Sequence, residues 1–469
     1  MRFAIFLAIL PISIGLVLTR SDAITPIVAG FSEVDITAPV GFRMSGYFQE
    51  RFSTGVKDPL YARSMVLKQG DTQVALVFCD LIGVPLAVTE QARQGASHAT
   101  GIPKENILIA ATHSHTGPLF FNARREYFHE QAIAEHGSDP HEAVDYESKL
   151  IADMVAGIQE AQSNLQPVNL QTGSTRVEGL SFNRRFHMKD GTVRFNPGRN
   201  NPDIVRPAGP IDPEMSLLFL ETKESEQPIA AFTVFALHLD TTGGALFSAD
   251  YPFYLHEKLR EKYGEKFYSI FGPGTCGDIN HINVHQESSQ KKGLEAERIG
   301  NALAEEVLQA VTKLESLASP SLAVRQAVIQ APLQKYTEEE IEEAQENMKR
   351  IGTKDLPFLE QVRAYKILDL QAFKGETYPL EVQAIRLGKE TAIVGLPAEI
   401  FVEIGLRIKE ESPFQDTIVV ELCNDSLGYI PTEKAFKEGS YETVNSCVQP
   451  GVGETLAATA IELLDQLDH

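Results

Sequence analysis

The stretch Ala111-Thr-His-Ser-His-Thr-Gly-Pro118 follows Asn106-Ile-Leu-Ile-Ala-Ala111, a short apolar run that is typical of a buried strand. If the strand continues into His113-Ser-His115, both imidazoles point to one face, because side chains alternate across a strand. Gly117-Pro118 then ends the element. Two imidazoles at the end of a buried strand suit a divalent metal such as zinc, or one metal ligand with a proton-transfer partner beside it. The alternative is a pair of hydrogen-bonded polar residues with no ligand.

His238 repeats the setting of His113. It lies at the end of the predicted strand 229–240, just before Thr241-Thr-Gly-Gly244, a loop that would leave the ring open to a cavity. A lone histidine of this kind is usually part of the core, but two parallel cases indicate a shared site. Glu399 stands between the predicted strand 391–396 and a helix expected to begin at Pro397, where a carboxylate is favoured by the helix dipole anyway.

Other polar residues follow strands in the same way. The glycine-rich loop 272–283 comes after a buried strand, and its Asp278 and Asn280 could supply oxygen ligands or hydrogen bonds to a ligand. A loop that only crosses the molecule is the alternative reading. Arg184 or Arg185 could hold a substrate oxygen or lie on the surface. Tyr429 lies in the loop after the last predicted strand.

Composition and charge narrow the class of protein. The chain has 469 residues, is 43% hydrophobic and 23% charged, and is therefore long enough for one large or two ordinary domains with a substantial core. Its formal net charge of −22 repels nucleic acid and gains nothing from anionic lipid, so nucleic-acid functions are excluded. A lipid substrate would have to be held by an apolar groove.

The N-terminus predicts export. Arg2 precedes the apolar run 3–18, and Ser21-Asp22-Ala23 provides small residues for cleavage after Ala23, which is typical of a secretory signal peptide in a secreted or periplasmic protein. The run is short for a membrane anchor, and no later segment could cross a bilayer. Export permits disulfides, and the four cysteines allow three pairings that sequence cannot choose among.

The pattern of elements predicts an α/β fold with a mixed β-sheet core, flanking helices and a metal site at strand ends. No domain boundary is visible within residues 24–469. The polar stretch 121–142 is predicted to be a solvent-exposed segment outside the core, with solvated histidines at His129, His136 and His141. Residues 333–372 contain a capping box at Thr337 and two predicted helices, and both stretches are interpreted as insertions that could reshape an entrance.

The order of these elements resembles the neutral/alkaline (non-lysosomal) ceramidases along most of residues 24–469, as one catalytic domain. The short motifs that carry the resemblance are Asp35-Ile-Thr, Met44-Ser-Gly-Tyr47, Tyr61-Ala-Arg63, Ala111–Pro118, Asn183-Arg184, His238, Gly277-Asp278, Pro397-Ala-Glu399 and Gly428-Tyr429. The chain departs from the family loop Gly-Asp-Val-Ser-Pro-Asn, because it reads Gly277-Asp-Ile-Asn-His-Ile there. It is also expected to lack the family's C-terminal immunoglobulin-like domain.

The resemblance implies specific roles. Zinc is held in the family by residues that correspond to His113, His238, Glu399 and Tyr429. His115 matches a histidine that assists proton transfer.

Further roles follow from the same resemblance. Arg184 matches an arginine near the catalytic centre, and Tyr441 a tyrosine that helps to stabilise the oxyanion. Asn280, beside Asp278, stands where the family serine meets the hydroxyl of the substrate's head group, so head-group recognition is expected to differ.

These roles predict an exported zinc-dependent amidohydrolase that cleaves an N-acyl amide bond with metal-activated water. Ceramide is the leading substrate by resemblance. One alternative keeps the same site and changes the substrate to another N-acyl compound or an ester. A second alternative is a zinc-holding binding protein without turnover.

Overall fold

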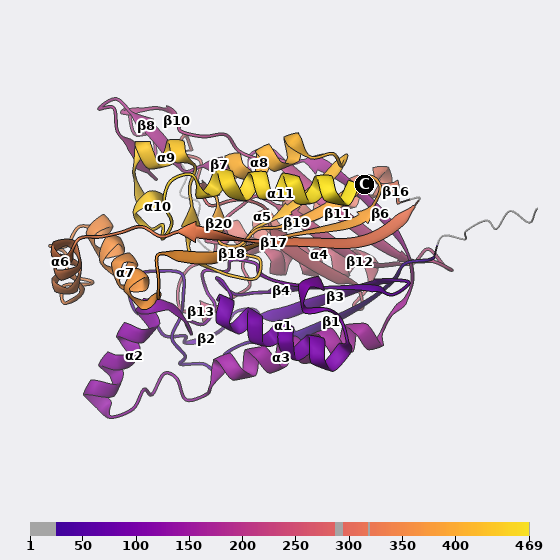
Figure 1. The fold of residues 1–469 in the computed structure, drawn as a ribbon, viewed down its shortest axis with the longest axis horizontal. Coiled ribbons are helices and arrows are strands. Elements are labelled where there is room, and N and C mark those ends of the chain that lie inside the picture. The colour runs from indigo at the N-terminus through magenta and orange to yellow at the C-terminus, as the bar shows by residue number, and fades with distance from the viewer. Residues whose placement is uncertain (1–24, 287–293, 318, 469) are drawn as a thin grey trace, which may run out of the picture.

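Two β-sheets packed face to face form the centre of the protein, which the computed structural model describes for residues 25–286, 294–317 and 319–468 (Figure 1). The predicted signal peptide lies outside these residues. The larger, nine-stranded sheet runs in the order β14 (Tyr268–Pro273), β12 (Pro228–Phe235), β11 (Glu214–Thr222), β6 (Gln166–Arg176), β1 (Val28–Asp35), β3 (Tyr61–Gln69), β4 (Thr72–Cys79) and β5 (Ile107–Ala111), with β16 (Glu315–Ser316) on β6. The smaller sheet consists of β17 (Pro320–Pro332), β18 (Thr377–Gly388), β19 (Thr391–Gly395) and β21 (Asp416–Val420).

Both sheets mix parallel and antiparallel pairs, so the predicted mixed-sheet core is confirmed. The pairs β4–β5, β12–β14 and β19–β21 are parallel, and the other pairs in these two sheets are antiparallel. The division of the strands over two stacked sheets was not foreseen. It arises because the strands are apolar on both faces, and an apolar face must be buried against another layer.

Strand β4 shows how alternation produces the layers. Val74, Leu76 and Phe78 belong to the buried cluster that joins the two sheets. Ala75 and Val77 point to the other face and pack with the apolar sides of α1 (Leu86–Thr100) and α3 (Tyr146–Ser163). One strand therefore serves two cores, since successive side chains leave a strand on opposite sides.

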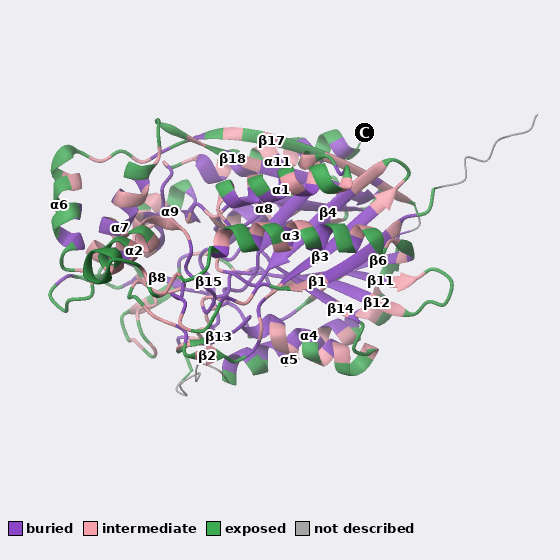
Figure 2. Cartoon of the chain, turned by 90° about the horizontal axis from the view of Figure 1, so that it is seen from below, coloured by how far each residue is buried: buried purple, intermediate pink, exposed green. Residues whose placement is uncertain are grey.

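Helices cover both outer faces, which gives the order helix, sheet, sheet, helix (Figure 2). Beside α1 and α3, the larger sheet carries α4 (Tyr251–Tyr263) and α5 (Leu294–Ala310). The smaller sheet carries α8 (Val402–Glu411) and α11 (Val452–Asp468). Among the described residues, none of the helices has the length and apolar character that a bilayer-spanning segment requires.

Three helices gather beyond one end of the sheets, at the left of Figure 1. They are α2 (Asn122–His136), α6 (Glu338–Met348) and α7 (Phe358–Ala372), which correspond to the two stretches interpreted as insertions. Their buried cluster includes Met348 and Tyr365, with Phe48 and Tyr127 packed against it. The two stretches, far apart in sequence, thus meet over the same end of the molecule.

The expectation that the histidines of residues 121–142 are solvated is wrong for two of three. The His129 Nδ1 atom lies 2.9 Å from Asp139 Oδ2, and the His141 ring stacks on Phe52 with centroids 3.6 Å apart. Only His136 is exposed. The prediction failed because the charged side chains of this segment pair with one another and with the buried Arg43, and not with water.

Short strand pairs and helices fix the loops between these layers. The strand pairs are β20 (Glu399–Ile400) with β22 (Tyr429–Ile430), β7 (Phe182–Asn183) with β15 (Ile279–Asn280), and β2 (Gly55–Val56) with β13 (Leu246–Phe247). A three-stranded sheet consists of β8 (Arg185–Met188), β9 (Val193–Phe195) and β10 (Ile204–Pro207). The short helices are α9 (Glu433–Glu438), α10 (Tyr441–Val444) and the 3-10 turns Lys104–Asn106 and Val311–Lys313. All four cysteines are buried free thiols, so none of the three disulfide pairings forms.

A buried arginine ties residues 121–142 to the body of the protein. The fully buried Arg43 guanidinium lies 2.8 Å from carboxylate oxygens of Asp139, Glu142 and Glu50. Removal of one partner from a buried ion cluster leaves uncompensated charge, which costs far more than the loss of an exposed pair.

We therefore expect Arg43→Met to lower the free energy of unfolding by about 3 kcal/mol, because Asp139 and Glu142 lose a buried partner. Arg176→Met is the matched control, since the Arg176–Glu178 pair is largely exposed, and it should change stability by less than about 0.5 kcal/mol. Urea unfolding of both variants measures the difference. Equal stabilities would show that the Arg43 cluster does not hold this segment.

Candidate metal centre

The ends of three strands from both sheets meet at one edge. The Ala111 N–H at the end of β5 donates to the Leu422 carbonyl just after β21, and the Glu421 N–H donates to the Pro273 carbonyl at the end of β14. His113 follows β5 by two residues, and His238 follows β12, the neighbour of β14, by three. The carboxyl ends of the parallel pairs therefore place chain segments from both sheets around one point, as predicted for a site at strand ends.

The chain reaches His113 by a turn and not by continuation of the strand, as the sequence had suggested. Strand β5 ends at Ala111, and His113 has a φ of 80°, which is uncommon and strained for a residue with a Cβ. The N–H groups of His113 and Ser114 both donate to the Leu81 carbonyl, which holds this conformation. The two imidazoles converge even so, with His115 Nε2 lying 3.2 Å from His113 Nε2.

Three imidazole nitrogens converge at the centre. The Nε2 atom of His113 lies 3.0 Å from Nε2 of His238 and 3.2 Å from Nε2 of His115. The Nδ1 atoms face the carbonyl oxygens of Ile82, Gly46 and Cys276 at 2.8, 3.0 and 3.3 Å. A carbonyl can only accept, so each Nδ1 carries a proton, and a ring that is otherwise neutral presents the lone pair of its Nε2 to the centre.

Glu399 adds a carboxylate to the cluster. Its Oε2 lies 3.3 Å from His113 Nε2 and 3.7 Å from His238 Nε2, is buried, and has no hydrogen-bond partner. Although burial opposes the charge, the neighbouring His113 holds the pKa of Glu399 down at about 2. Glu399 does not open a helix, as the sequence had suggested. It lies in β20, four residues after β19, and α8 starts only at Val402.

Tyr429 is brought to the same point by strand pairing. β20 and β22 run parallel with Glu399 opposite Tyr429, and the Glu399 N–H donates to the Gly428 carbonyl. The phenol is buried, and burial together with the Glu399 charge raises its pKa well above the usual value. The four residues predicted to surround one ion are thus neighbours in the fold.

These groups fit a divalent metal ion. The potential ligand atoms of His113, His115 and His238 all lie within 4.8 Å of one another. Metal-binding histidines commonly donate their other ring N–H to a carbonyl, as all three do here. Burial lowers the pKa of His115 to about 4 and that of His238 well below its usual value, so both offer the neutral ring that a metal requires. Imidazole and carboxylate ligands suit zinc among other divalent ions.

Arg184 lies beside the cluster, as predicted. Its Nε donates to Glu442 at 2.9 Å, its Nη2 donates to the Gly277 carbonyl at 2.6 Å, and its Nη1 lies 3.4 Å from His238 Nε2. The guanidinium carbon also lies 5.8 Å from the centre of the Tyr441 ring. Tyr441 is half-buried next to Tyr429, with ring centroids 5.5 Å apart, so Arg184 and Tyr441 both lie beside the cluster.

Asp278 and Asn280 differ in position. Both Asp278 oxygens bind within the protein, one accepting from the Val402 N–H at 2.9 Å and the other from Asn183 Nδ2 at 2.7 Å. These contacts indicate that Asp278 positions α8 and β7. Asn280 lines a cavity beside His238 and donates to Asn196 Oδ1 at 3.0 Å. Its position on the cavity wall is compatible with the predicted contact with a substrate.

Glu421 was missed by the sequence analysis. This fully buried carboxyl accepts from the N–H groups of Ile400 and Cys276, at 2.7 and 3.1 Å. It thereby connects the strand that carries Glu399 to the loop whose carbonyl orients His238, and burial raises its pKa to about 8. A charged residue inside the apolar run of a strand was the available signal, because carboxylates are seldom fully buried without a role.

The centre lies where two cavities meet. One cavity of about 530 Å³ extends under α7 and α2 and is lined by His113, His115, Glu399 and Tyr429 among others. The second, of about 590 Å³, is lined by His115, His238, Arg184 and Tyr429, and also by Asp240. His115, Tyr429 and Tyr441 border both cavities, and a molecule lying across the centre could extend into each.

The family model for the neutral/alkaline non-lysosomal ceramidase N-terminal domain matches residues 28–297. The chain therefore belongs to the neutral/alkaline non-lysosomal ceramidase family, whose members are amidohydrolases. The neutral ceramidase of Pseudomonas aeruginosa is 26% identical over 271 residues, which cover 54% of this chain and 36% of that relative. The match thus spans little more than a third of the relative's length.

Two solved structures share the fold. The crystal structure of neutral ceramidase from Pseudomonas aeruginosa has a TM-score of 0.71 at 20% identity and covers 95% of this chain and 75% of that one. A ceramidase complexed with C2 has a TM-score of 0.69 at 19% identity, covering 94% and 75%. At these identities the likeness confirms the architecture, including the second sheet and the C-terminal elements that lie beyond the family match.

We expect His113→Ala to lose bound divalent metal, because it removes the lone pair closest to the other two imidazoles and to Glu399. The loss of metal affinity should be at least about 100-fold, above the range found for supporting residues around metal sites. Metal analysis of purified protein after dialysis against zinc and then buffer measures it. The exposed His136→Ala on α2 is the control and should keep the wild-type metal content; full retention by His113→Ala would contradict the site.

Proposed function

We propose that the protein is an exported zinc-dependent amidohydrolase that cleaves N-acyl amides, with ceramide as the leading substrate. The observation that supports this most is the convergence of three imidazole Nε2 atoms and the Glu399 carboxylate at the junction of two cavities. In this proposal His113, His238, Glu399 and Tyr429 hold the metal. Membership of the family indicates that the bond cleaved is an amide. The apolar side chains that line the cavity under α7 suit a lipid chain.

A zinc ion held by these residues would supply a water of lowered pKa and polarise an amide carbonyl. His115 has the position of a proton carrier. Its Nδ1–H donates to the Gly46 carbonyl, which fixes the ring, and its Nε2 borders both cavities. Nε2 can accept the proton of an attacking water and return it to the nitrogen of the leaving amine.

Two further groups stabilise negative charge. The buried Arg184 keeps its charge, because the neighbouring Tyr429 and Glu442 raise its pKa in spite of burial. The Tyr441 hydroxyl accepts from Asn445 Nδ2 at 3.1 Å and can donate its own proton to the oxyanion of a tetrahedral intermediate. Both groups are in place before substrate binds, so little reorganisation is required during the reaction.

The two cavities suit the two halves of an amide. Asp240 lines the cavity that contains Arg184 and accepts from the Tyr47 hydroxyl, so an acidic group faces the side on which an amine would gain positive charge. We assign the amine half to this cavity and the acyl half to the cavity under α7. Asn280 and Asn196 then border the amine half, where the head group of the substrate would lie.

Zinc-loaded protein, incubated with ceramide and with a panel of other N-acyl amines and esters, tests the proposal. Release of fatty acid and amine, abolished by a chelator and restored by zinc, is the expected result. Turnover of another N-acyl compound or an ester without ceramide would keep the site and replace the substrate. Tight zinc binding without any turnover would favour the zinc-holding protein and contradict the enzyme.

We expect His115→Gln to lower kcat by about 10²–10⁴-fold, the usual contribution of a positioned proton carrier. Zinc content should stay near that of the wild type, because His113, His238 and Glu399 remain. Steady-state kinetics together with metal analysis separate the two effects. Loss of zinc in parallel with activity would instead make His115 a ligand, and unchanged kcat would remove it from the mechanism.

A further inference from the structure

A helix outside the two sheets places an aromatic ring against Tyr441. Phe358, the first residue of α7, stacks on the Tyr441 ring, with centroids 5.7 Å apart and an angle of 24° between the ring planes. Phe358 also lines the cavity assigned to the amine half of the substrate. At 47% exposure Phe358 is not a core residue, so packing within the insertion does not explain its place. The proposed reaction has so far no role for this ring.

The backbone of Tyr441 is anchored more firmly than its ring. The next residue, Glu442, is fully buried and accepts from Arg184 Nε at 2.9 Å and from Arg185 Nη1 at 3.0 Å. These bonds fix the main chain of the four-residue helix α10, but they do not fix the side-chain torsions of Tyr441. The hydroxyl accepts from Asn445, which follows the same short helix and moves with it. The orientation of the Tyr441 ring therefore depends on the rings packed against it.

Three phenylalanine rings contact the Tyr441 ring. The Phe195 ring, at the end of β9, lies 4.8 Å away and is inclined by 37°, and the Phe48 ring lies 6.3 Å away at 90°. Phe48 also meets Phe358 edge to face, with centroids 5.5 Å apart. Stacked and edge-to-face pairs at these distances are the favoured arrangements of aromatic rings. Phe358 is the one of the three that belongs to residues 333–372, so the insertion supplies part of the wall that holds Tyr441.

We infer that Phe358 is a positioning residue, which holds the Tyr441 ring in the orientation that brings its hydroxyl to the oxyanion. Position matters here because a displacement of about 1 Å can lower a rate by about 100-fold. The insertion then contributes to the rate of the reaction, in addition to shaping the entrance. The inference rests on the proposed amidohydrolase function, in which Tyr441 donates to the oxyanion, and adds a residue that acts through Tyr441.

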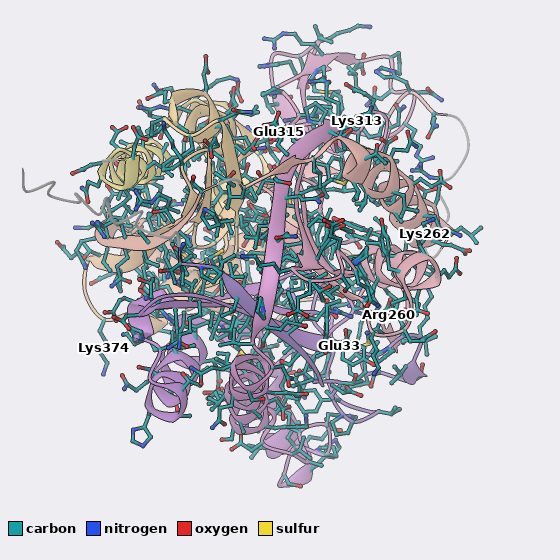
Figure 3. The ribbon with its side chains drawn as sticks, turned by 90° about the vertical axis from the view of Figure 1, so that its right-hand side faces the viewer. Glu33, Arg260, Lys262, Lys313, Glu315 and Lys374 are labelled. Carbon is teal, nitrogen blue, oxygen red and sulfur yellow. The ribbon has the colours of Figure 1, made fainter. Side chains whose placement is uncertain are left out.

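Steady-state kinetics with the amide that the wild type cleaves fastest test the inference. Phe358→Ala should lower kcat by about tenfold with little change in KM, because the loss of one stacked ring lets Tyr441 leave its working orientation. Phe358→Tyr keeps the ring and should keep kcat near that of the wild type. The controls are Leu359→Ala, at the adjacent residue, which is 39% exposed, and Lys374→Ala, at an exposed residue just beyond the other end of α7 (Figure 3). A raised KM with unchanged kcat would place Phe358 against the substrate and overturn the inference.

A double-mutant cycle shows whether Phe358 acts through Tyr441. Tyr441→Phe removes the oxyanion donor and should lower kcat by about 10²–10³-fold. Phe358→Ala added to Tyr441→Phe should then lower kcat by no more than about twofold further, since the hydroxyl that Phe358 positions is already absent. If the two effects multiply instead, Phe358 acts independently of Tyr441 and the inference is overturned.

A fluorescence measurement keeps the test separate from the proposed reaction. The chain contains no tryptophan, so Phe358→Trp and the control Leu359→Trp each introduce a single indole on α7. Adding Tyr441→Ala should shift the emission of the Phe358→Trp protein to longer wavelength and increase its quenching by acrylamide, and should leave the Leu359→Trp protein unchanged. If the emission responds in this way but no amide is hydrolysed, the proposed function fails and the positioning of Tyr441 by Phe358 stands. If amides are hydrolysed but the emission does not respond, the inference alone fails.

Discussion

The convergence of three imidazole Nε2 atoms on one point is the constraint on which the site depends. The Nε2 atoms of His113, His115 and His238 lie 3.0–3.2 Å apart along two edges, and each ring is held by a carbonyl at Nδ1. Rings fixed in this way cannot turn their N–H groups towards one another. A metal ion between the three Nε2 atoms would be bound by the lone pairs of the neutral rings, and the Glu399 oxygen without a hydrogen-bond partner is placed to share it.

The two stacked sheets make this convergence possible. Each sheet buries both faces, so the strand ends are fixed by packing on two sides and cannot shift independently. His113 and His238 follow strands of the larger sheet, whereas Glu399 follows the smaller one. The candidate metal site is therefore also a junction between the sheets, which the buried Glu421 reinforces through backbone groups on both sides.

The sequence predicted the residues of the site better than their backbone. Apolar runs in the sequence locate the strands, and polar residues at the ends of these runs indicate a shared site. His113 nevertheless lies in a strained turn, and Glu399 in a two-residue strand. Both conformations are imposed by tertiary hydrogen bonds, to Leu81 and Gly428, which local sequence patterns do not encode. Local patterns also do not encode which strands pair, so the sequence predicts one mixed-sheet core where the structure has two sheets.

In the proposed function, the sheets carry the metal chemistry and the helices outside them determine the specificity. The residues proposed to hold the metal belong to the sandwich, a fold that the chain shares with a solved neutral ceramidase at 20% identity. The cavity that would receive the acyl chain is closed by α2 and α7, and the Lys366 ammonium enters it from α7. A helix added outside the sheets can change without disturbing the strand ends, because its own small core with Tyr365 and Met348 holds it. Under the proposed function, changes in these helices would alter substrate range and leave the proposed metal site in place.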